Sequence, residues 1–326
     1  MALCSTRCLF ILFILSAIPI AFLISLELAN PPSHVYYYHS TGYLRECAKW
    51  DDLGRRFLVG FMTGGGVGQV SVPDDYSPDT ILEEVPVIKD AELQGNASLG
   101  IVVDRPRNRL LVVFADLLAN KYSGLAAYDL SSWKRQFLTH LSGPNDEKSF
   151  ADDVAVDSEG NAYVTDAKNS KIWKVGVDGK FISMINSPLF IPKQWYKNLV
   201  GLNGIVYHPD GYLLVIHTFS GNLYKIDLVK GEEVKLINVT GGSLMLGDGL
   251  ELLSPTKLVV AGNPAGRLVE STDGWETASL VSTCSGLKHR LATSATVKNG
   301  RVYLSHMIGI GYPKKKHALV EAVFSP

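Results

Sequence analysis

Short apolar runs separated by turn residues dominate the chain from residue 43 onward. The runs are rich in Val, Leu, Ile and Tyr, they alternate between apolar and polar positions, and Gly, Pro, Asn and Asp separate them. A two-residue period bounded by turn residues predicts β-strands. No long helical period interrupts this pattern, so we expect an all-β body.

The same pattern repeats along the chain. Two segments are clear copies of one unit: Asp152–Asp166 (DDVAVDSEGNAYVTD) and Asn203–His217 (NGIVYHPDGYLLVIH). Each copy predicts a strand, a tight turn and a second strand, which together form a β-hairpin. Weaker copies complete a set of six whose starts lie 45–53 residues apart; they begin at Glu46, Leu99, Asp248 and Thr293.

Units of this length, with about four strands each, are typical of β-propeller blades. Third strands are predicted after most hairpins, for example at Ser170–Val175 and Asn222–Leu228. The last copy leaves too little chain for four strands, so we expect His34–Ser40 to supply its missing strand. The sequence therefore predicts a six-bladed β-propeller of four-stranded blades over residues 30–326. A two-sheet sandwich is the alternative, but it would not explain six hairpins in register.

A separate apolar element precedes the repeats. Residues Leu9–Ser25 carry no charge, and Arg7 lies just before them. A positive residue followed by an apolar run is typical of a secretory signal peptide, with a weak cleavage site near Ala29. A run of this length is also at the short limit for a membrane anchor, and a buried helix is a third alternative. We expect residues 1–29 to direct the body into the secretory pathway, membrane-bound only if the segment is retained.

Two further features agree with that route. Asn96 and Asn238 begin Asn-x-Ser/Thr sequons, which are glycosylated only in a secretory compartment. Outside the N-terminal segment the chain has two cysteines, Cys47 and Cys284. An oxidising compartment allows one disulfide between them, and two buried free thiols are the alternative.

Composition excludes one class of partner. The 31 Lys and Arg residues nearly balance 32 Asp and Glu residues, which leaves a net charge of −1. Nucleic-acid binding usually requires a basic face, so we expect no nucleic-acid partner. With 326 residues, 46% of them hydrophobic, the chain is long enough to bury a core without disulfides or metals.

The repeat register places one residue of each copy at the mouth of the central channel. Four of these six residues carry oxygen-bearing Glu, Asp or Asn side chains; the set is Glu46, Leu99, Asp152, Asn203, Asp248 and Thr293. Three converging carboxylates repel one another unless a cation or protons neutralise them. Hard oxygen ligands without thiols favour Ca²⁺ or Mg²⁺, and Ca²⁺ is better suited to a loose ring completed by waters. We therefore predict a calcium site formed by Glu46, Asp152, Asn203 and Asp248; a proton-sharing or water-filled polar channel is the alternative.

These motifs resemble a known superfamily of propellers, the gluconolactonases, senescence-marker proteins (regucalcin) and calcium-dependent phosphotriesterases. Glu46-Cys-Ala-Lys-Trp50 is similar to the family's opening Glu-Gly-Pro-x-Trp motif, whose Glu binds calcium. The stretch Leu202-Asn203-Gly204-Ile205 with His208-Pro-Asp-Gly211 resembles the motif whose Asn is a ligand. Gly247-Asp248-Gly249 resembles the motif whose Asp contacts the metal and serves as base or nucleophile. The resemblance covers about residues 43–324.

The sequence also departs from that family. Asp152-Asp153 occurs where the family usually has Asn-Asp, and the added carboxylate should tighten cation binding but can alter the role of Asp248. Plant strictosidine-synthase-like proteins share the architecture and a secretory N-terminus, and in them a late, metal-free acid performs the condensation. No acid occurs between Cys284 and Lys316, which favours the calcium hydrolases.

The predicted activity is hydrolysis of a lactone or related ester. The resemblance implies that calcium polarises the carbonyl and that Asp248 activates water or attacks directly. His217 and His306, which end second strands, are candidate proton carriers, although each is also interpretable as a wall residue. Phe61 and Phe114 end equivalent strands, so we expect a small, partly apolar substrate.

Two other functions stay open at this point. One is a strictosidine-synthase-like condensing or isomerising enzyme of specialised metabolism. The other is a non-catalytic propeller whose calcium is structural and whose face binds a partner. A propeller fold alone does not separate these functions.

Overall fold

The computed structural model describes residues 6–29, 31, 33–118, 121–143, 145–263, 266–287 and 289–324. The chain divides into two compact units, Met1–Pro32 and Ser33–Pro326. The first unit contains helix α1 (Thr6–Leu28), which includes the predicted apolar run and has Pro19 inside it. Within the described residues, no helix combines the length and apolarity needed to cross a membrane.

The second unit is built from antiparallel groups of four strands, as the repeat predicted. The first three groups are β2 (Arg45–Asp51), β3 (Arg56–Phe61), β4 (Gly66–Ser71) and β5 (Leu82–Lys89); β6 (Ala97–Asp104), β7 (Arg109–Ala115), β8 (Ser123–Asp129) and β9 (Arg135–Ser142); and β10 (Ala151–Val156), β11 (Ala162–Asp166), β12 (Lys171–Val175) and β13 (Phe181–Ile185).

The remaining groups follow the same order. They are β14 (Leu202–His208), β15 (Tyr212–His217), β16 (Asn222–Asp227) and β17 (Glu233–Thr240); β18 (Gly247–Ser254), β19 (Lys257–Gly262), β20 (Gly266–Glu270) and β21 (Thr277–Cys284); and β22 (Ala292–Lys298), β23 (Arg301–Ile310), β24 (Lys315–Glu321) and β1 (Val35–Ser40). Short 3-10 helices lie in connections: η1 (Ala91–Leu93), η2 (Arg105–Arg107), η3 (Pro188–Phe190) and η4 (Trp195–Asn198).

Strand β1 closes the ring. It pairs antiparallel with β24 along its whole length, from Val35 opposite Val320 to Ser40 opposite Lys315. The expectation that His34–Ser40 supplies the fourth strand of the last group is therefore confirmed. Joining the two ends of the chain in one group removes the open edge that a linear series of sheets would leave.

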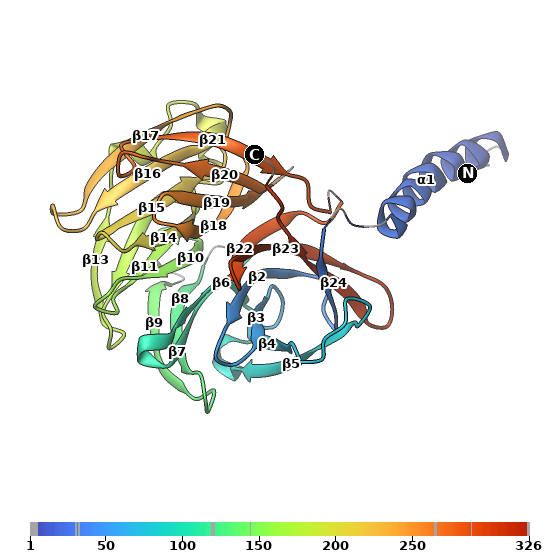
Figure 1. Ribbon diagram of the computed structural model, residues 1–326, viewed down its shortest axis with the longest axis horizontal. Helices are drawn as coiled ribbons and strands as arrows, with labels where there is room; N and C mark the ends of the chain where they lie inside the picture. Colours follow the sequence, from blue (N-terminus) through green and yellow to red (C-terminus); the bar gives the residue numbers. More distant parts are fainter. Residues whose placement is uncertain are drawn as a thin grey trace. The chain divides into compact units, whose positions relative to one another are not determined.

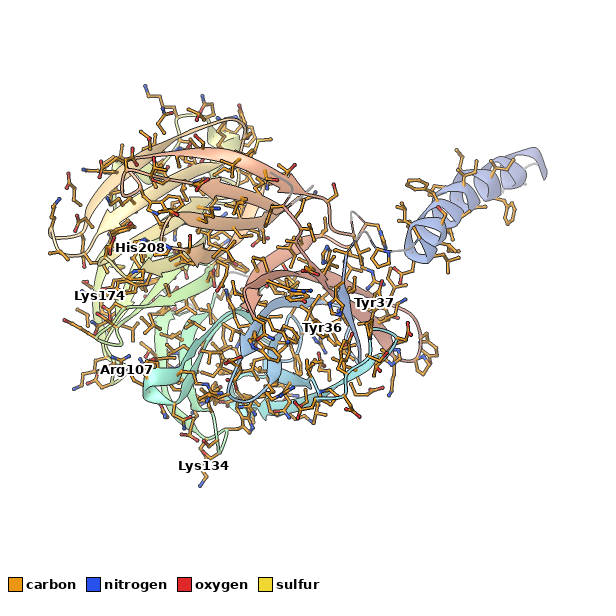
Figure 2. The ribbon with its side chains drawn as sticks, viewed as in Figure 1. Tyr36, Tyr37, Arg107, Lys134, Lys174 and His208 are labelled. Carbon is orange, nitrogen blue, oxygen red and sulfur yellow. The ribbon has the colours of Figure 1, made fainter. Side chains whose placement is uncertain are left out.

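The first strands of the six groups surround one centre (Figure 1). Each contacts the first strand of the next group, in the closed order β2, β6, β10, β14, β18, β22 and back to β2. Apolar clusters fill the space between successive groups; for example, Leu58 and Val67 pack with Leu110 and Val112. In Figure 2 the side chains fill the body of this unit, whereas Lys134 projects from its rim.

This arrangement is a β-propeller, but its hydrogen bonding does not divide into six separate sheets. Parallel pairs between outer strands, β1 with β5 and β17 with β21, merge four of the groups into two eight-stranded sheets. The groups β6–β9 and β10–β13 form four-stranded sheets. The repeat did not predict these outer pairs, because the sequence period describes each group and not the contacts between neighbouring outer strands.

Candidate functional site

A backbone irregularity recurs at the mouth of the channel in all six groups. Pairing of the first with the second strand shifts register there, between Arg45 and Ala48, Ser98 and Ile101, Ala151 and Val154, Leu202 and Ile205, Gly247 and Leu250, and Ala292 and Ser294. Each shift contains the predicted mouth residue of that group. A β-bulge re-aims side chains locally, so the six mouth residues share one backbone device.

Glycines beside three mouth residues let neighbouring first strands approach closely. A Cβ at Gly100 would lie 2.5 Å from the Cα of Asp153, and one at Gly249 would lie 2.8 Å from the carbonyl oxygen of Thr293. A Cβ at Gly204 would meet the carbonyl oxygen of Asp248. An isolated glycine in a strand marks a bulge or a close backbone approach, and this signal could have predicted the bulges.

The structure brings the predicted quartet together. Loss of hydration raises the pKa of Glu46 well above its usual value, and the carboxylates of Asp248 and Asp152 raise it further. The pKa of Asp152 is also raised well above its usual value, mainly by burial and then by the charge of Asp248. Burial raises the pKa of Asp248 to about 7, while a hydrogen bond from the Asn203 side chain opposes that shift. Mutual repulsion among these groups shows that they lie within one electrostatic site.

Asp153 belongs to the same site, although it was not among the predicted ligands. One oxygen accepts the N–H of Val154 at 2.9 Å, and the other accepts the N–H of Ile205 at 3.2 Å, which ties β10 to β14. Burial raises the pKa of Asp153 to about 6, and the Lys49 ammonium opposes this shift. The consecutive Asp152-Asp153 pair was its sequence signal, but only the bulge lets both side chains reach the site.

The donor chemistry of the mouth fits a hard cation. Oxygen Oε2 of Glu46 is buried without a hydrogen-bond partner, and the neighbouring donors are carboxylate and amide oxygens, which Ca²⁺ prefers. Among the described residues, however, no three or more His, Cys, Asp or Glu side chains are arranged so that they could hold a metal ion. The fit to a cation therefore rests on the chemistry of the donors, and in this structure they do not form a completed metal cage.

His306 is placed to support backbone and not to carry protons. Its Nε2 accepts the N–H of Leu287 at 3.1 Å, and its Nδ1 lies 3.2 Å from the carbonyl oxygen of Leu304. These contacts engage both ring nitrogens and fix one neutral tautomer. Burial lowers the pKa of His306 to about 4, so the ring stays neutral near pH 7.

His217 closes the turn that follows its strand. Its Nδ1 accepts the N–H of Ser220 at 3.4 Å, while Nε2 is buried without a partner. Burial lowers its pKa to about 4. Asp166 has the corresponding place in another group, where its Oδ1 accepts the N–H groups of Lys168 and Asn169. These second-strand ends therefore cap turns, which the sequence pattern did not separate from a catalytic ring.

The predicted apolar wall is not found as expected. Phe114 is completely buried in the core between the first two groups, so it does not line a substrate site. The Arg45 guanidinium packs over the Phe61 ring, with its Cζ atom 4.2 Å from the centre of the ring. The expectation that both residues line the substrate pocket was wrong for Phe114. This residue comes one position before the end of β7, and its side chain lies on the face that packs against the first group.

A cavity lies beyond the mouth in the same channel. It measures about 190 Å³, and residues from five first strands line it, mainly Val102, Val154, Val156, Ile205, Val206 and Leu252. Two charged residues complete the lining, Lys49 and Glu251, whose Nζ and Oε2 are 2.5 Å apart. The channel therefore has an acidic mouth and a largely apolar inner chamber that contains one ion pair.

The remaining predicted features lie away from this channel or are buried in the core. Cys47 and Cys284 are free, buried thiols, which selects that alternative over a disulfide. Asn238 is exposed on β17, and Asn96 is partly exposed just before β6.

Sequence comparison does not assign the chain to a family. No family model matches it, and no curated protein matches it by sequence. The predicted membership in the gluconolactonase superfamily therefore has no support from sequence comparison.

Comparison of structures supports the fold. The chain is similar to the major allergen Mala s 1 of Malassezia sympodialis, with a TM-score of 0.68 and 16% identity over 88% of this chain and 96% of that one. The WD40 repeats of RRP9 match with a TM-score of 0.57 and 8% identity over 90% and 100% of the chains. A luciferin-regenerating enzyme matches with a TM-score of 0.56 and 13% identity over 91% and 98%.

These similarities establish the propeller and leave the activity open. At such low identity the shared property is the arrangement of strands, and propellers with this arrangement include both enzymes and WD40 repeats. The function must therefore be argued from the channel.

Proposed function

We propose that this protein is a six-bladed, cation-dependent hydrolase of lactones or related esters. Each four-stranded group is counted as one blade, and the parallel outer pairs are contacts between blades. The observation that carries the proposal is the convergence of Glu46, Asp152 and Asp248 at one mouth, where burial and mutual repulsion raise the pKa of each carboxyl. Such a cluster is costly for folding and is typical of a functional site.

Glu46, Asp152, Asn203 and Asp248 would hold the cation, and calcium suits this oxygen set best. Neutralising three carboxylates removes their repulsion, and the unpartnered Oε2 of Glu46 would gain a partner. When bound, calcium supplies Lewis acidity that favours negative charge on a carbonyl oxygen.

Asp248 is the proposed base or nucleophile. In the cation-free protein burial raises its pKa to about 7, and a cation bound beside it would favour the carboxylate form that a base or nucleophile requires. Asn203 donates a hydrogen bond to it and so orients the carboxyl. His217 and His306 are not assigned as proton carriers, because their ring nitrogens contact backbone groups or are sealed in the core.

The inner chamber supports a substrate with an apolar portion. Valine, isoleucine and leucine side chains form most of the wall beyond the acids. Apolar walls with a few polar groups favour small, partly apolar ligands. The proposed secretory route follows from the N-terminal segment and the two sequons, and it is independent of the chemistry.

A non-catalytic binding propeller is the second candidate. The observation in its favour concerns the two predicted proton carriers: both ring nitrogens of His306 contact backbone groups, and His217 is completely buried. In that case the cation would only stabilise the fold. A strictosidine-synthase-like condensing enzyme would need no cation at the mouth.

Calcium titration of the full-length protein by calorimetry tests the proposal. We expect wild type to bind one Ca²⁺, and Glu46→Ala and Asp248→Ala to weaken binding at least about 100-fold, since each removes a charged ligand. Asp210→Ala is the control, because this exposed acid lies on the turn after β14, away from the mouth. Absence of binding in wild type would refute the cation-dependent hydrolase.

Turnover then separates the two cation-binding functions. Lactones, aryl esters and phosphotriesters are screened with calcium-loaded wild type and Asp248→Asn. A hydrolase loses at least about 100-fold in kcat with Asp248→Asn. Full turnover by that variant would contradict the assigned role of Asp248, and no turnover by wild type would favour the binding propeller.

A further inference from the structure

One ammonium group connects three first strands inside the channel. Lys49 on β2 donates to Glu251 Oε2 on β18 at 2.5 Å and to the carbonyl oxygen of Ala295 on β22 at 2.9 Å. Since β22 lies between β2 and β18 in the ring, the Lys49 side chain crosses one strand to reach its partner. The Lys49 side chain is 16% exposed, and the Glu251 side chain is 24% exposed.

This pair lies one layer below the acidic mouth. Lys49 follows Glu46 by three residues on β2, and Glu251 follows Asp248 by three residues on β18. Asp153 links the two layers electrostatically: it directly follows the mouth residue Asp152, and the charges of Lys49 and Glu251 both act on its carboxyl. Lys49 also lowers the pKa of Glu46, so its charge reaches the mouth.

Stability alone is a poor reason for this pair. The corresponding positions of the other four groups are Val102, Ala155, Val206 and Thr296, and three of these four are apolar. A largely buried ion pair is seldom more stabilising than apolar residues of similar volume. Five carboxylates share the channel with the Lys49 ammonium; they are Glu46, Asp152, Asp153, Asp248 and Glu251. A fixed positive charge in such a site changes how strongly it attracts another cation.

We propose that Lys49 is the built-in counter-cation of the channel, held below the mouth by Glu251, and that this pair limits the affinity of the mouth for a divalent cation. The inference rests on the proposed function only in placing a cation at the mouth. Lys49 and Glu251 are positioning residues here, since neither is among the proposed cation ligands.

Opposite charge changes predict opposite effects on affinity. Lys49→Met removes the positive charge and leaves the Glu251 carboxylate, so calcium should bind on the order of tenfold more tightly. Glu251→Gln removes the negative charge and frees Lys49 to approach Asp153, so binding should weaken on the order of tenfold. The double variant Lys49→Met/Glu251→Gln restores the net charge and should bind within about threefold of wild type.

The test is calorimetric titration of CaCl₂ into four full-length proteins: wild type, Lys49→Met, Glu251→Gln and the double variant. It measures the calcium affinity of each, and thermal unfolding is recorded for each. Lys174→Met is the matched control. Lys174 lies on β12, the third strand of its group, and Figure 2 shows it at the edge of the unit. Its Nζ is 3.6 Å from Oε1 of Glu232, so it also belongs to an ion pair. If Lys49→Met does not fold, Lys49→Gln carries the same prediction, because the amide keeps hydrogen bonding without the charge.

Each result has a distinct meaning. Tighter binding by Lys49→Met and weaker binding by Glu251→Gln support the inference. Weaker binding by both single variants would show that the pair only shapes the channel, and would overturn the inference while leaving the proposed function intact. Binding by Lys49→Met but not by wild type would support the inference and refute the proposed calcium hydrolase. Absence of binding in all four proteins would refute both.

Discussion

Strand β2 carries a carboxylate at each end of the channel, and the two have opposite surroundings. At the far end, Asp51 accepts from Arg56 Nε at 2.9 Å, from the Arg105 guanidinium and from the N–H of Gly54 at 3.3 Å. At the mouth, Oε2 of Glu46 has no hydrogen-bond partner, and its charged neighbours include other acids. The two carboxylates are five residues apart on one strand.

The comparison shows that burial alone does not identify a functional carboxylate. A buried charge with enough donors holds the fold together, whereas buried charges of like sign cost stability unless something else binds them. Asp51 belongs to the first kind and Glu46 to the second. On β2, the number of hydrogen-bond donors around a buried carboxylate, and not its exposed area, distinguishes the structural Asp51 from the proposed functional Glu46.

The largest expected effect on stability is at Asp51, at the far end of β2. Asp51→Ala leaves Arg56 and Arg105 without their shared carboxylate and should lower the free energy of unfolding by about 3 kcal/mol. Urea denaturation measures this loss. Asp52→Ala, an exposed neighbour, is the control and should change stability by less than about 0.5 kcal/mol. Equal losses from both substitutions would remove the distinction drawn for Asp51.

The opposite sign is expected at the mouth. Without divalent cations at pH 8, Asp248→Asn should raise the free energy of unfolding by about 2–4 kcal/mol, because it removes a carboxyl whose pKa is raised from 3.8 to about 7. Urea denaturation in EDTA measures the gain. In saturating calcium the variant should become less stable than wild type, and a loss of stability in EDTA would contradict the comparison.

The mouth should also make stability depend on pH. The folded protein keeps protons on Asp248 and Asp153 that the unfolded chain releases above pH 4, so folding binds protons between about pH 4 and pH 7. In EDTA their contribution to stability should therefore fall as pH rises through this window, by about 1.4 kcal/mol per pH unit for each proton bound. Saturating calcium should reduce the fall. Comparison with Asp248→Asn isolates the contribution of Asp248 to the free energy of unfolding. If that contribution rose with pH, the raised pKa assigned to Asp248 would be contradicted.

The smallest effects are expected at the histidines. Burial lowers the pKa values of His217 and His306 to about 4, so both rings should stay neutral from pH 5 to pH 8. NMR titration of the imidazole Hε1 signals, assigned with His217→Gln and His306→Gln, measures this directly. Titration of either buried ring near pH 6.5 would restore it as a candidate proton carrier.

Some features of this protein were readable from residue order. The recurring hairpins predicted the four-stranded groups, and the shortage of chain after Thr293 predicted that β1 would close the ring. The register of the repeats placed Glu46, Asp152, Asn203 and Asp248 at one end of the channel, where the three carboxyls act on one another and Asn203 hydrogen-bonds to Asp248. These conclusions needed only a periodic pattern, because every copy folds into the same unit and starts at the same end.

Other features depended on contacts between copies. The pairing of Lys49 with Glu251, the bond from Ile205 N–H to Asp153 and the engagement of both His306 nitrogens join residues from 19 to 202 positions apart in the chain. The merging of outer strands likewise joins neighbouring groups. A local pattern cannot specify such pairs, since it contains no information on which side chains meet.

By itself, the sequence determined the repeating unit, the closure of the ring and the convergence of acids at one mouth, because strand period and turn residues act locally. Only the tertiary structure decided which charges are paired, which histidines are sealed and which strands merge. Those outcomes depend on distances and on exclusion of water, which arise when the six groups close around one axis.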